Sequence, residues 1–210
     1  MKKIMFNDRY GLTKAVLEGR KTMTRRIIKA PKTMEGQWVS GFAICKRPGS
    51  DEVVEVMALD ADEGMINNIL PKYKPGEVVA VAQRYKDIRD IIGDIQEGKH
   101  IKFMAGWNNK MFVSADLMLH QIRITNIRIE MLQDISDDDC MREGIYNWKD
   151  APDCPDGHKN SKIELFGYDG SWDGFQTPRE AFAALIDKVS GNGTWERNPW
   201  VFVYEFELVK

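Results

Sequence analysis

A segment near the start of the chain gathers side chains that suit anion binding. Residues 18–26 read EGRKTMTRR and hold four cations and two hydroxyls. If these residues form a strand, Lys21 and Arg25 share one face while Thr24 lies on the other. Arginine offers a bidentate fork and lysine a point charge, so this face suits a phosphate or a carboxylate. Thr24 joins the same site only if the strand twists or bulges.

The positive charge in this region is local. From Lys14 to Lys29 there are six basic residues against the single acid Glu18, whereas the whole chain carries a net charge of -2. The overall charge therefore gives no sign of a nucleic-acid partner, and any such sign comes from this segment. Such a charged run is also typical of a solvated face.

A second group of candidates lies near the C-terminus. The ring of Trp195 offers a stacking surface for a base, and the amide of Asn198 both donates and accepts hydrogen bonds. Each has a simpler alternative: tryptophan commonly packs in the core, and an asparagine before Pro199 commonly forms a turn. Trp107 and Trp148 are further stacking candidates with the same alternative.

Other kinds of site have little support in the sequence. Cys154 and His158 have a spacing found in metal sites, but no partner ligands accompany them. His100 and His120 are isolated, and no glycine-rich phosphate loop is present. We expect no metal ion and no cofactor.

The cationic segment follows a short predicted helix. Leu12, Ala15 and Val16 recur at helical spacing, and Gly19 stands where a left-handed glycine ends a helix. Two further helices are predicted, one from Ser136 to Gly144 and one from Thr177 to Gly191, each with a capping hydroxyl at its start.

The remaining elements are mostly strands. Patterning predicts a hairpin of 37–44 with 53–58, a buried strand at 77–83, a short strand at 111–113, and strands at 119–130 and 200–208. The parity of the isoleucines in 119–130 changes across Thr125 and Asn126, which predicts a β-bulge there. Residues 60–72 read as a surface excursion, 84–102 as an amphipathic helix, and 146–176 as an ordered loop or lid.

Three blocks resemble one known family. They are the cationic segment with the helix before it, the strand and helix within 121–145, and the closing strand at 195–206, entered through Asn-Pro-Trp. In this order they are similar to the ASCH domain, as found in phage and prophage proteins, which is a relative of the RNA-associated PUA domain. The resemblance covers about half of the chain. It implies an α+β fold, namely a PUA-like β-barrel with flanking helices and loop insertions.

The resemblance also implies an organisation and a function. Residues 1–210 would form a single domain with insertions at about 60–72, 84–102 and 146–176, in the cytoplasm of a bacterium or its phage. The expected activity is binding of RNA or a modified nucleotide in a cationic cleft. The residues expected to line it are Lys21, Thr24, Arg25, Arg123, Trp195 and Asn198.

An enzyme is the alternative. Some small bacterial members of the family are amidohydrolases that remove the acetyl group of N4-acetylcytidine with a Lys-Thr-Glu set, and Lys21 and Thr24 match its first two members. An ungapped alignment of the strand and helix puts Arg123 where the glutamate would lie. Another acid would then have to replace it, from among Glu77, Asp116 and Glu205. This departure favours binding over hydrolysis.

A third hypothesis is a protein-interaction adaptor, in which the cleft cations are dispensable and the 146–176 loop is not.

The composition fits all three hypotheses. A chain of 210 residues that is 43% apolar can bury one sizeable core, and no apolar run is long enough to span a bilayer. Three cysteines, odd in number and widely spaced, favour a reducing compartment. RNA, DNA and a free nucleoside remain open as ligands, as does the oligomeric state.

Overall fold

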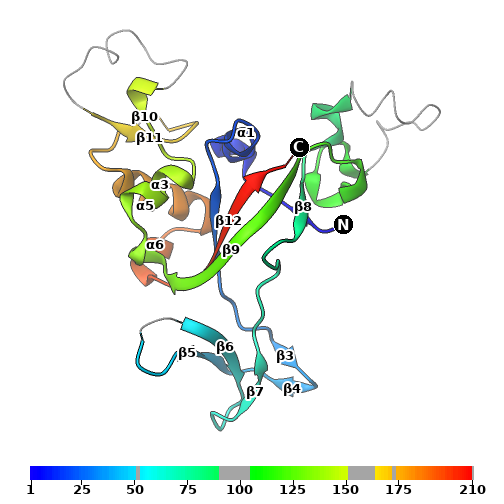
Figure 1. Cartoon of the computed structure of the whole chain (residues 1–210), viewed down its shortest axis with the longest axis vertical. Coiled ribbons are helices and arrows are strands. Elements are labelled where there is room, and N and C mark those ends of the chain that lie inside the picture. Colours follow the sequence, from blue (N-terminus) through cyan, green and yellow to red (C-terminus); the bar gives the residue numbers. More distant parts are fainter. Residues whose placement is uncertain (51–52, 90–104, 151–163, 172–173, 210) are drawn as a thin grey trace.

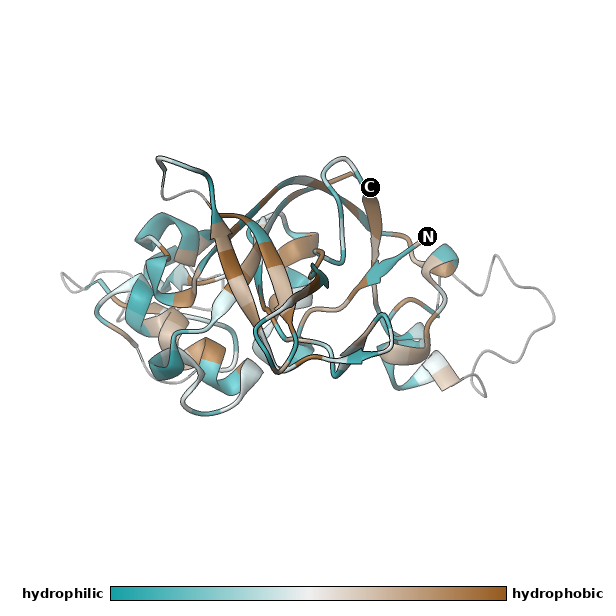
Figure 2. Cartoon of the chain, turned by 90° about the horizontal axis from the view of Figure 1, so that it is seen from below, coloured by the Kyte–Doolittle hydropathy of each residue, from teal (hydrophilic) through white to brown (hydrophobic). Residues whose placement is uncertain are grey.

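The computed structural model describes residues 1–50, 53–89, 105–150, 164–171 and 174–209. The fold is α+β, and strands account for more of the described chain than helices do (Figure 1). Apolar residues run along the strands, whereas the helices alternate apolar and polar residues, as expected for elements that cover a core (Figure 2).

A five-stranded sheet forms the centre of the molecule, in the order β1-β8-β9-β12-β2. β1 pairs in parallel with β8, and the other neighbours are antiparallel. The bounds are β1 Lys3–Ile4, β8 Val78–Val81, β9 Gln121–Met131, β12 Trp200–Leu208 and β2 Met23–Ile27. Among the described strands, β1 and β2 remain as open edges, so the predicted barrel does not close.

The predicted irregularity in the long strand is confirmed. β9 pairs with β12 from Ile122 to Met131, but Glu205 opposes Asn126 while Phe206 opposes Ile124. Thr125 is therefore the extra residue of a bulge. The bulge lets Ile122 and Ile124 stay fully buried although the isoleucine parity changes beyond it.

The helices form where capping residues predict them. α1 spans Leu12–Leu17, α3 spans Asp137–Arg142 with the Ser136 hydroxyl at its N-cap, and α5 spans Pro178–Ser190 with Thr177 at its N-cap. The four-residue α6 spans Thr194–Arg197. Figure 1 shows α3, α5 and α6 grouped together at one side of the sheet. The sheet and these helices share one hydrophobic core, in which Phe182 of α5 and Val201 of β12 are buried.

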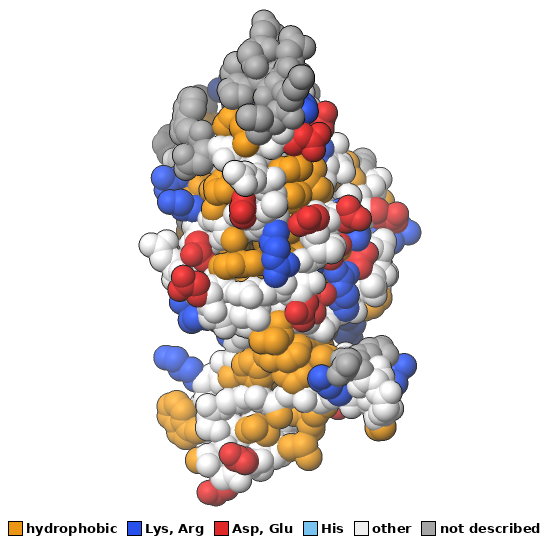
Figure 3. Space-filling view, turned by 90° about the vertical axis from the view of Figure 1, so that its left-hand side faces the viewer, with side chains coloured by type: hydrophobic (Ala, Val, Ile, Leu, Met, Phe, Trp, Pro, Cys, Tyr) orange, Lys and Arg blue, Asp and Glu red, His pale blue; other side chains and the backbone are white. Residues whose placement is uncertain are grey.

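A smaller group of strands lies below the central sheet in Figure 1 and is called the smaller body. β5 Gly41–Lys46, β6 Val53–Leu59 and β7 Met65–Asn68 form a three-stranded antiparallel sheet, with the two-stranded hairpin of β3 Thr33–Met34 and β4 Gln37–Trp38 beside it. The predicted 37–44/53–58 hairpin is confirmed for β5 and β6, but its first strand begins only at Gly41, because residues 37–38 pair with 33–34 instead. On the face drawn in Figure 3, hydrophobic side chains gather over the upper part of this smaller body, while the larger body above it shows hydrophobic patches interspersed with charges of both signs.

Several local predictions need correction. The excursion at 60–72 contains a strand, β7, because its asparagines and Met65 pair with β6. The strand predicted at 111–113 is instead part of η5 (Lys110–Phe112), a 3₁₀ turn capped by the side chain of Asn109. Of the helix predicted at 84–102, the described part holds only η2 (Tyr85–Asp87), and 90–104 lies outside the described residues.

The segment predicted as a loop or lid is described only at its ends. β10 (Tyr146–Asn147) and β11 (Phe166–Gly167) pair with each other, and residues 151–163, which include Cys154 and His158, lie outside the described residues. Three further 3₁₀ turns, η1 Asp8–Tyr10, η4 Ala105–Trp107 and η6 Ala115–Leu117, complete the elements near the sheet, and η7 Leu132–Asp134 and η8 Trp148–Asp150 follow β9 and β10.

Candidate functional site

The turn after α1 places Lys21 ahead of the strand rather than within it. Gly19 adopts a left-handed φ of 74°, and the backbone N–H of Lys21 donates to the carbonyl of Ala15 at 2.9 Å. Pairing with β12 begins only at Met23. The strand parity that would separate Lys21 from Thr24 therefore does not apply, and both residues line the same cavity.

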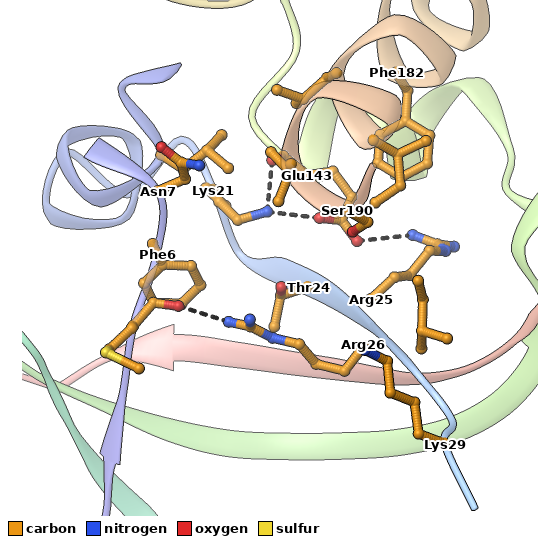
Figure 4. Close-up of a pocket in the computed structure, with 16 residues that line it drawn as sticks. Phe6, Asn7, Lys21, Thr24, Arg25, Arg26, Lys29, Glu143, Phe182 and Ser190 are labelled. Carbon is orange, nitrogen blue, oxygen red and sulfur yellow. Dashed lines mark hydrogen bonds and ion pairs between the residues drawn. The ribbon is translucent and has the colours of Figure 1, made fainter. Parts of the chain in front are cut away.

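This cavity has a volume of about 360 Å³. β2 forms one wall, the second half of α5 another, and the N-terminal segment around Phe6 a third (Figure 4). The polar residues that line it are Asn7, Lys21, Thr24, Arg25, Arg26, Lys29, Glu143 and Ser190. The volume lies in the usual range of small-molecule sites.

The ammonium of Lys21 is buried against Glu143. Nζ donates to Oε2 and to the backbone carbonyl of Glu143, each at 2.6 Å, and the two side chains are 2% and 6% exposed. Burial lowers the pKa of Lys21, and the Glu143 carboxylate offsets part of this effect. An ammonium has three N–H donors, so one remains for a group in the cavity.

Arg25 holds the other oxygen of the same carboxylate. Its Nη1 donates to Glu143 Oε1 at 3.2 Å, while Nη2 lies 2.6 Å from Glu130 Oε1 and 2.9 Å from Asp139 Oδ2. Burial acts to lower the pKa of Arg25, but the carboxylates of Glu143 and Glu130 outweigh it and raise that pKa. The charge of Arg25 is thus balanced inside the protein, and its fork orients Glu143.

The ion cluster continues away from the cavity. Arg128 contacts Glu130, Asp139 and Glu205, and Arg142 reaches Glu205 at 2.8 Å. These contacts tie α3 to the middle of β9 and β12. The acidic start of α3 therefore meets arginines of the sheet, and the end of the helix, where Glu143 stands, is fixed relative to β2.

Thr24 supplies a buried hydroxyl at the floor of the cavity. The residue is 5% exposed, and in the described part of the chain its hydroxyl has no hydrogen-bond partner. In Figure 4 the hydroxyl points up toward the space between Lys21 and Arg26. The neighbouring Thr22, by contrast, lies outside the cavity and accepts from Arg142 Nε at 3.3 Å. A buried polar group without a partner at a cavity wall marks a place for a ligand.

Arg26 closes the cavity on the side of the N-terminal segment. Its Nη2 donates to the carbonyl of Met5 at 2.8 Å, and its guanidinium lies 5.8 Å from the ring centre of Phe6. A guanidinium has five N–H donors. Among the described residues Arg26 has no carboxylate partner, so its charge is available to a ligand.

Three of the predicted binding residues lie elsewhere. Arg123 is on β9 opposite Val78 and Glu207, and it does not line the cavity. Trp195 packs edge-on against Phe182, with ring centres 6.2 Å apart, and under the guanidinium of Arg179. It is a partly buried residue of α6 that packs on the core beside the first turns of α5.

Asn198 ends α6 in a left-handed conformation with φ 45°. Its Oδ1 accepts from the backbone N–H of Gln133 at 2.7 Å. This is the turn role that the sequence left open for it. The structure thus brings Lys21, Thr24 and Arg25 together and leaves Arg123, Trp195 and Asn198 out of the cavity.

Sequence reasoning missed Glu143. None of the three acids named as replacements reaches Lys21: Glu77 pairs with Lys2, Asp116 is exposed near the N-terminus, and Glu205 pairs with arginines. A signal was nonetheless present. Glu143 directly precedes the glycine that ends the Ser136 helix, so a helix end docked beside the cationic segment would deliver it there.

Comparison of the chain with protein-family models, with curated proteins and with solved structures finds no match. Within the described ranges, no group of three or more histidine, cysteine or acidic side chains is arranged to hold a metal ion. The described helices are too short or too polar for any of them to cross a bilayer.

Proposed function

We propose that the protein hydrolyses an amide bond of an acylated nucleoside such as N4-acetylcytidine, with Thr24 as the nucleophile. The observation that carries this proposal is the buried contact of Lys21 with Glu143 beside the unpartnered hydroxyl of Thr24. A hydroxyl, a lysine whose pKa is lowered and a carboxylate are the parts of an activated nucleophile.

The chemistry follows from these three groups. The hydroxyl oxygen of Thr24 adds to the acyl carbon while neutral Lys21 takes the proton. Lys21 then gives that proton to the nitrogen of the leaving amine, the C–N bond breaks, and an ester forms on Thr24. Water attacks this ester, Lys21 takes a proton from the water, and the acid leaves as Thr24 recovers its hydrogen.

The other polar groups have supporting roles. Glu143 accepts hydrogen bonds from Lys21 and so fixes the direction of its Nζ, and Arg25 holds Glu143 in place. The free donors of Arg26 can stabilise the oxyanion that develops when Thr24 attacks. Phe182, Leu185 and Phe6 supply apolar walls for the uncharged part of the substrate.

The family resemblance supports the same assignment. The Lys-Thr-Glu set implied by an ASCH-type, PUA-like domain is complete in this chain when Glu143, rather than the residue at position 123, takes the place of the acid. The sequence alone argued against a hydrolase because a cation occupies the position expected for the acid. With Glu143 as the acid, that argument no longer applies.

Binding of RNA or a modified nucleotide without catalysis is the second candidate. It is favoured by Arg26 and Lys29, which line the cavity and have no carboxylate partner among the described residues. On this hypothesis Lys21 and Thr24 contact the ligand but change nothing in it.

The decisive experiment follows release of cytidine from N4-acetylcytidine by chromatography. The Thr24→Val and Lys21→Met variants should lose roughly 10³-fold or more in kcat/KM, because each removes a member of the reacting set. Thr22→Val is the matched control, since that hydroxyl lies outside the cavity. Circular dichroism of each variant establishes that it is folded.

Two outcomes would count against the hydrolase. One is absence of turnover by the folded wild type across several N4-acylated cytidines. The other is turnover that Thr24→Val leaves intact, since the nucleophile would then be a different group. Tight binding of the nucleoside without turnover would favour the second candidate.

A further inference from the structure

A second cavity of about 340 Å³ adjoins the first. It lies where two chain segments link the five-stranded sheet with the smaller body below it (Figure 1). One segment leaves β2 through Ile28 and Lys29, and the other returns from β7 through Ile69, Leu70 and Lys72. The cavity is therefore built from the connections that position the smaller body.

The two cavities share a wall. Arg26 and Lys29 line both of them, together with Met5 and Ile27. Arg26 therefore lies at the boundary between the first cavity, which Thr24 lines, and the second. Because the two cavities adjoin there, a ligand bound in the first can place an attached group in the second.

Positive side chains surround the second cavity. Those that line it are Lys3, Arg26, Lys29 and Lys72, and none of the described residues that line it is acidic. Each of these four lacks a carboxylate partner among the described residues. Lys3 donates to the carbonyls of Met111 and Val113, which takes up two of its three N–H donors but leaves its charge unbalanced.

This arrangement differs from that of the arginines in the ion cluster. Arg25 and Arg128 each contact three carboxylates, and Arg142 contacts two. The chain therefore balances cations with acids where the charges serve the fold. Four unbalanced cations around one cavity repel each other, and a bound anion relieves that repulsion.

The remaining wall is aromatic and held in place. Tyr73 donates its hydroxyl to the carbonyl of Lys3 at 2.9 Å, and the hydroxyl oxygen of Tyr204 accepts from the backbone N–H of Lys72 at 2.9 Å. The two rings meet edge to face, with centres 5.3 Å apart. Burial raises the pKa of Tyr73 to about 12, so this wall adds no negative charge at neutral pH.

We propose that the second cavity binds a phosphate group of the substrate, so that the preferred substrates are phosphorylated acyl-nucleosides rather than free ones. The substrate class rests on the proposed function, while the phosphate site itself is argued from the four cations alone. The phosphate comes either from a mononucleotide or from the backbone of an oligonucleotide, since both present the same charged oxygens to lysine and arginine.

The test compares kcat/KM for N4-acetylcytidine, its 5′-monophosphate and a short oligoribonucleotide containing it. The phosphorylated substrates should be preferred about tenfold or more, and the preference should shrink as salt rises. Lys72→Ala should lower the ratio of kcat/KM for the 5′-monophosphate to kcat/KM for N4-acetylcytidine. The reason is that Lys72 lines only the second cavity. Lys74→Ala is the matched control, an exposed lysine two residues away that lines neither cavity.

A binding arm separates this inference from the proposed function. Titration calorimetry measures the affinity of wild type and Lys72→Ala for cytidine and for cytidine 5′-monophosphate. Tighter binding of the monophosphate that Lys72→Ala reduces would support the phosphate site even if no substrate were hydrolysed. Equal turnover and equal binding with and without phosphate would overturn it and leave the hydrolase intact. A preference seen only for the oligonucleotide would support the site and identify a backbone phosphate as its ligand.

Discussion

The ammonium of Lys21 donates to both the backbone carbonyl and the side chain of Glu143, a residue 122 positions further along the chain, at 2.6 Å in each case. The contact joins the turn after α1 to the end of α3. It also removes two charges from water, so its geometry must be kept for the fold to tolerate it.

Removal of the Glu143 charge should destabilise the protein strongly. In Glu143→Gln the buried Lys21 and Arg25 lose the carboxylate they share, and breaking such a buried pair costs on the order of 3–5 kcal/mol. Urea unfolding measures the change. Arg20→Ala, which breaks the exposed pair with Glu18, should cost about 1 kcal/mol or less.

A double-mutant cycle with Lys21→Met tests the origin of that loss. If the pair is responsible, the double variant should be less destabilised than the sum of the two single variants, since neither charge is then left alone. Strictly additive losses would show that the two side chains do not depend on each other.

The lowered pKa of Lys21 predicts a pH dependence with a definite sign. Between that lowered value and the unfolded value of 10.5, the unfolded chain binds more protons at this site than the native one. The contribution of Lys21 to the free energy of unfolding therefore increases as pH rises through this window. Unfolding of wild type and Lys21→Met should be measured from neutral to alkaline pH.

In that comparison the stability difference should shift in favour of the wild type as pH rises. The proposed hydrolysis should change in the same direction, because Lys21 accepts a proton only in its neutral form. A stability difference that stays flat over the whole range would mean that the pKa of Lys21 is not perturbed.

Much of the framework was predictable because local signals and tertiary packing agree. The Thr177 cap with Pro178 predicts α5, and the parity change at Thr125 predicts the bulge in β9. The strand predicted at 111–113 failed because a capping asparagine, Asn109, favours a turn over the β propensity of the residues after it.

The site was only partly predictable, since its residues come from distant parts of the chain. Lys21 and Thr24 are close in sequence and were found together, but their shared cavity depends on where the turn ends and β2 begins. Glu143 reaches them only because α3 docks through its acidic first turn on Arg25 and Arg128. No periodicity of the sequence encodes such a contact.

The thiol of Cys140 should be chemically inert in the native protein. It is fully buried in α3, and burial raises its pKa to about 12. At pH 8 roughly one thiol in 10⁴ is then a thiolate, the form that reacts with alkylating agents. In a Cys154→Ser background, iodoacetamide should label the partly exposed Cys45 first, and Cys140 only after urea is added. Equal native labelling of both thiols would contradict the burial of Cys140.

Gly144 links the backbone of the α3 end to the position of Lys21. It has a φ of 106°, and a Cβ added to it would lie 3.3 Å from Leu12 Cδ2 and 3.6 Å from Lys21 Cδ. Gly191, at the end of α5, has nearly the same φ of 105° but no atom within 4 Å of such a Cβ. The two glycines therefore separate the effect of backbone strain from the effect of contact.

Both Gly144→Ala and Gly191→Ala should lose about 1–3 kcal/mol of stability from the unfavourable φ. Only Gly144→Ala should also press on Leu12, since the added Cβ meets Lys21 Cδ at an ordinary contact distance. Relief of the contact with Leu12 shifts the end of α3, and this moves the adjacent Glu143 relative to Nζ of Lys21. We therefore expect the kcat of the proposed hydrolysis to fall in Gly144→Ala and to stay near the wild-type value in Gly191→Ala. Equal kcat values for the two variants, measured where both are folded, would contradict the expected coupling between the contact at Gly144 and the catalytic contact of Glu143 with Lys21.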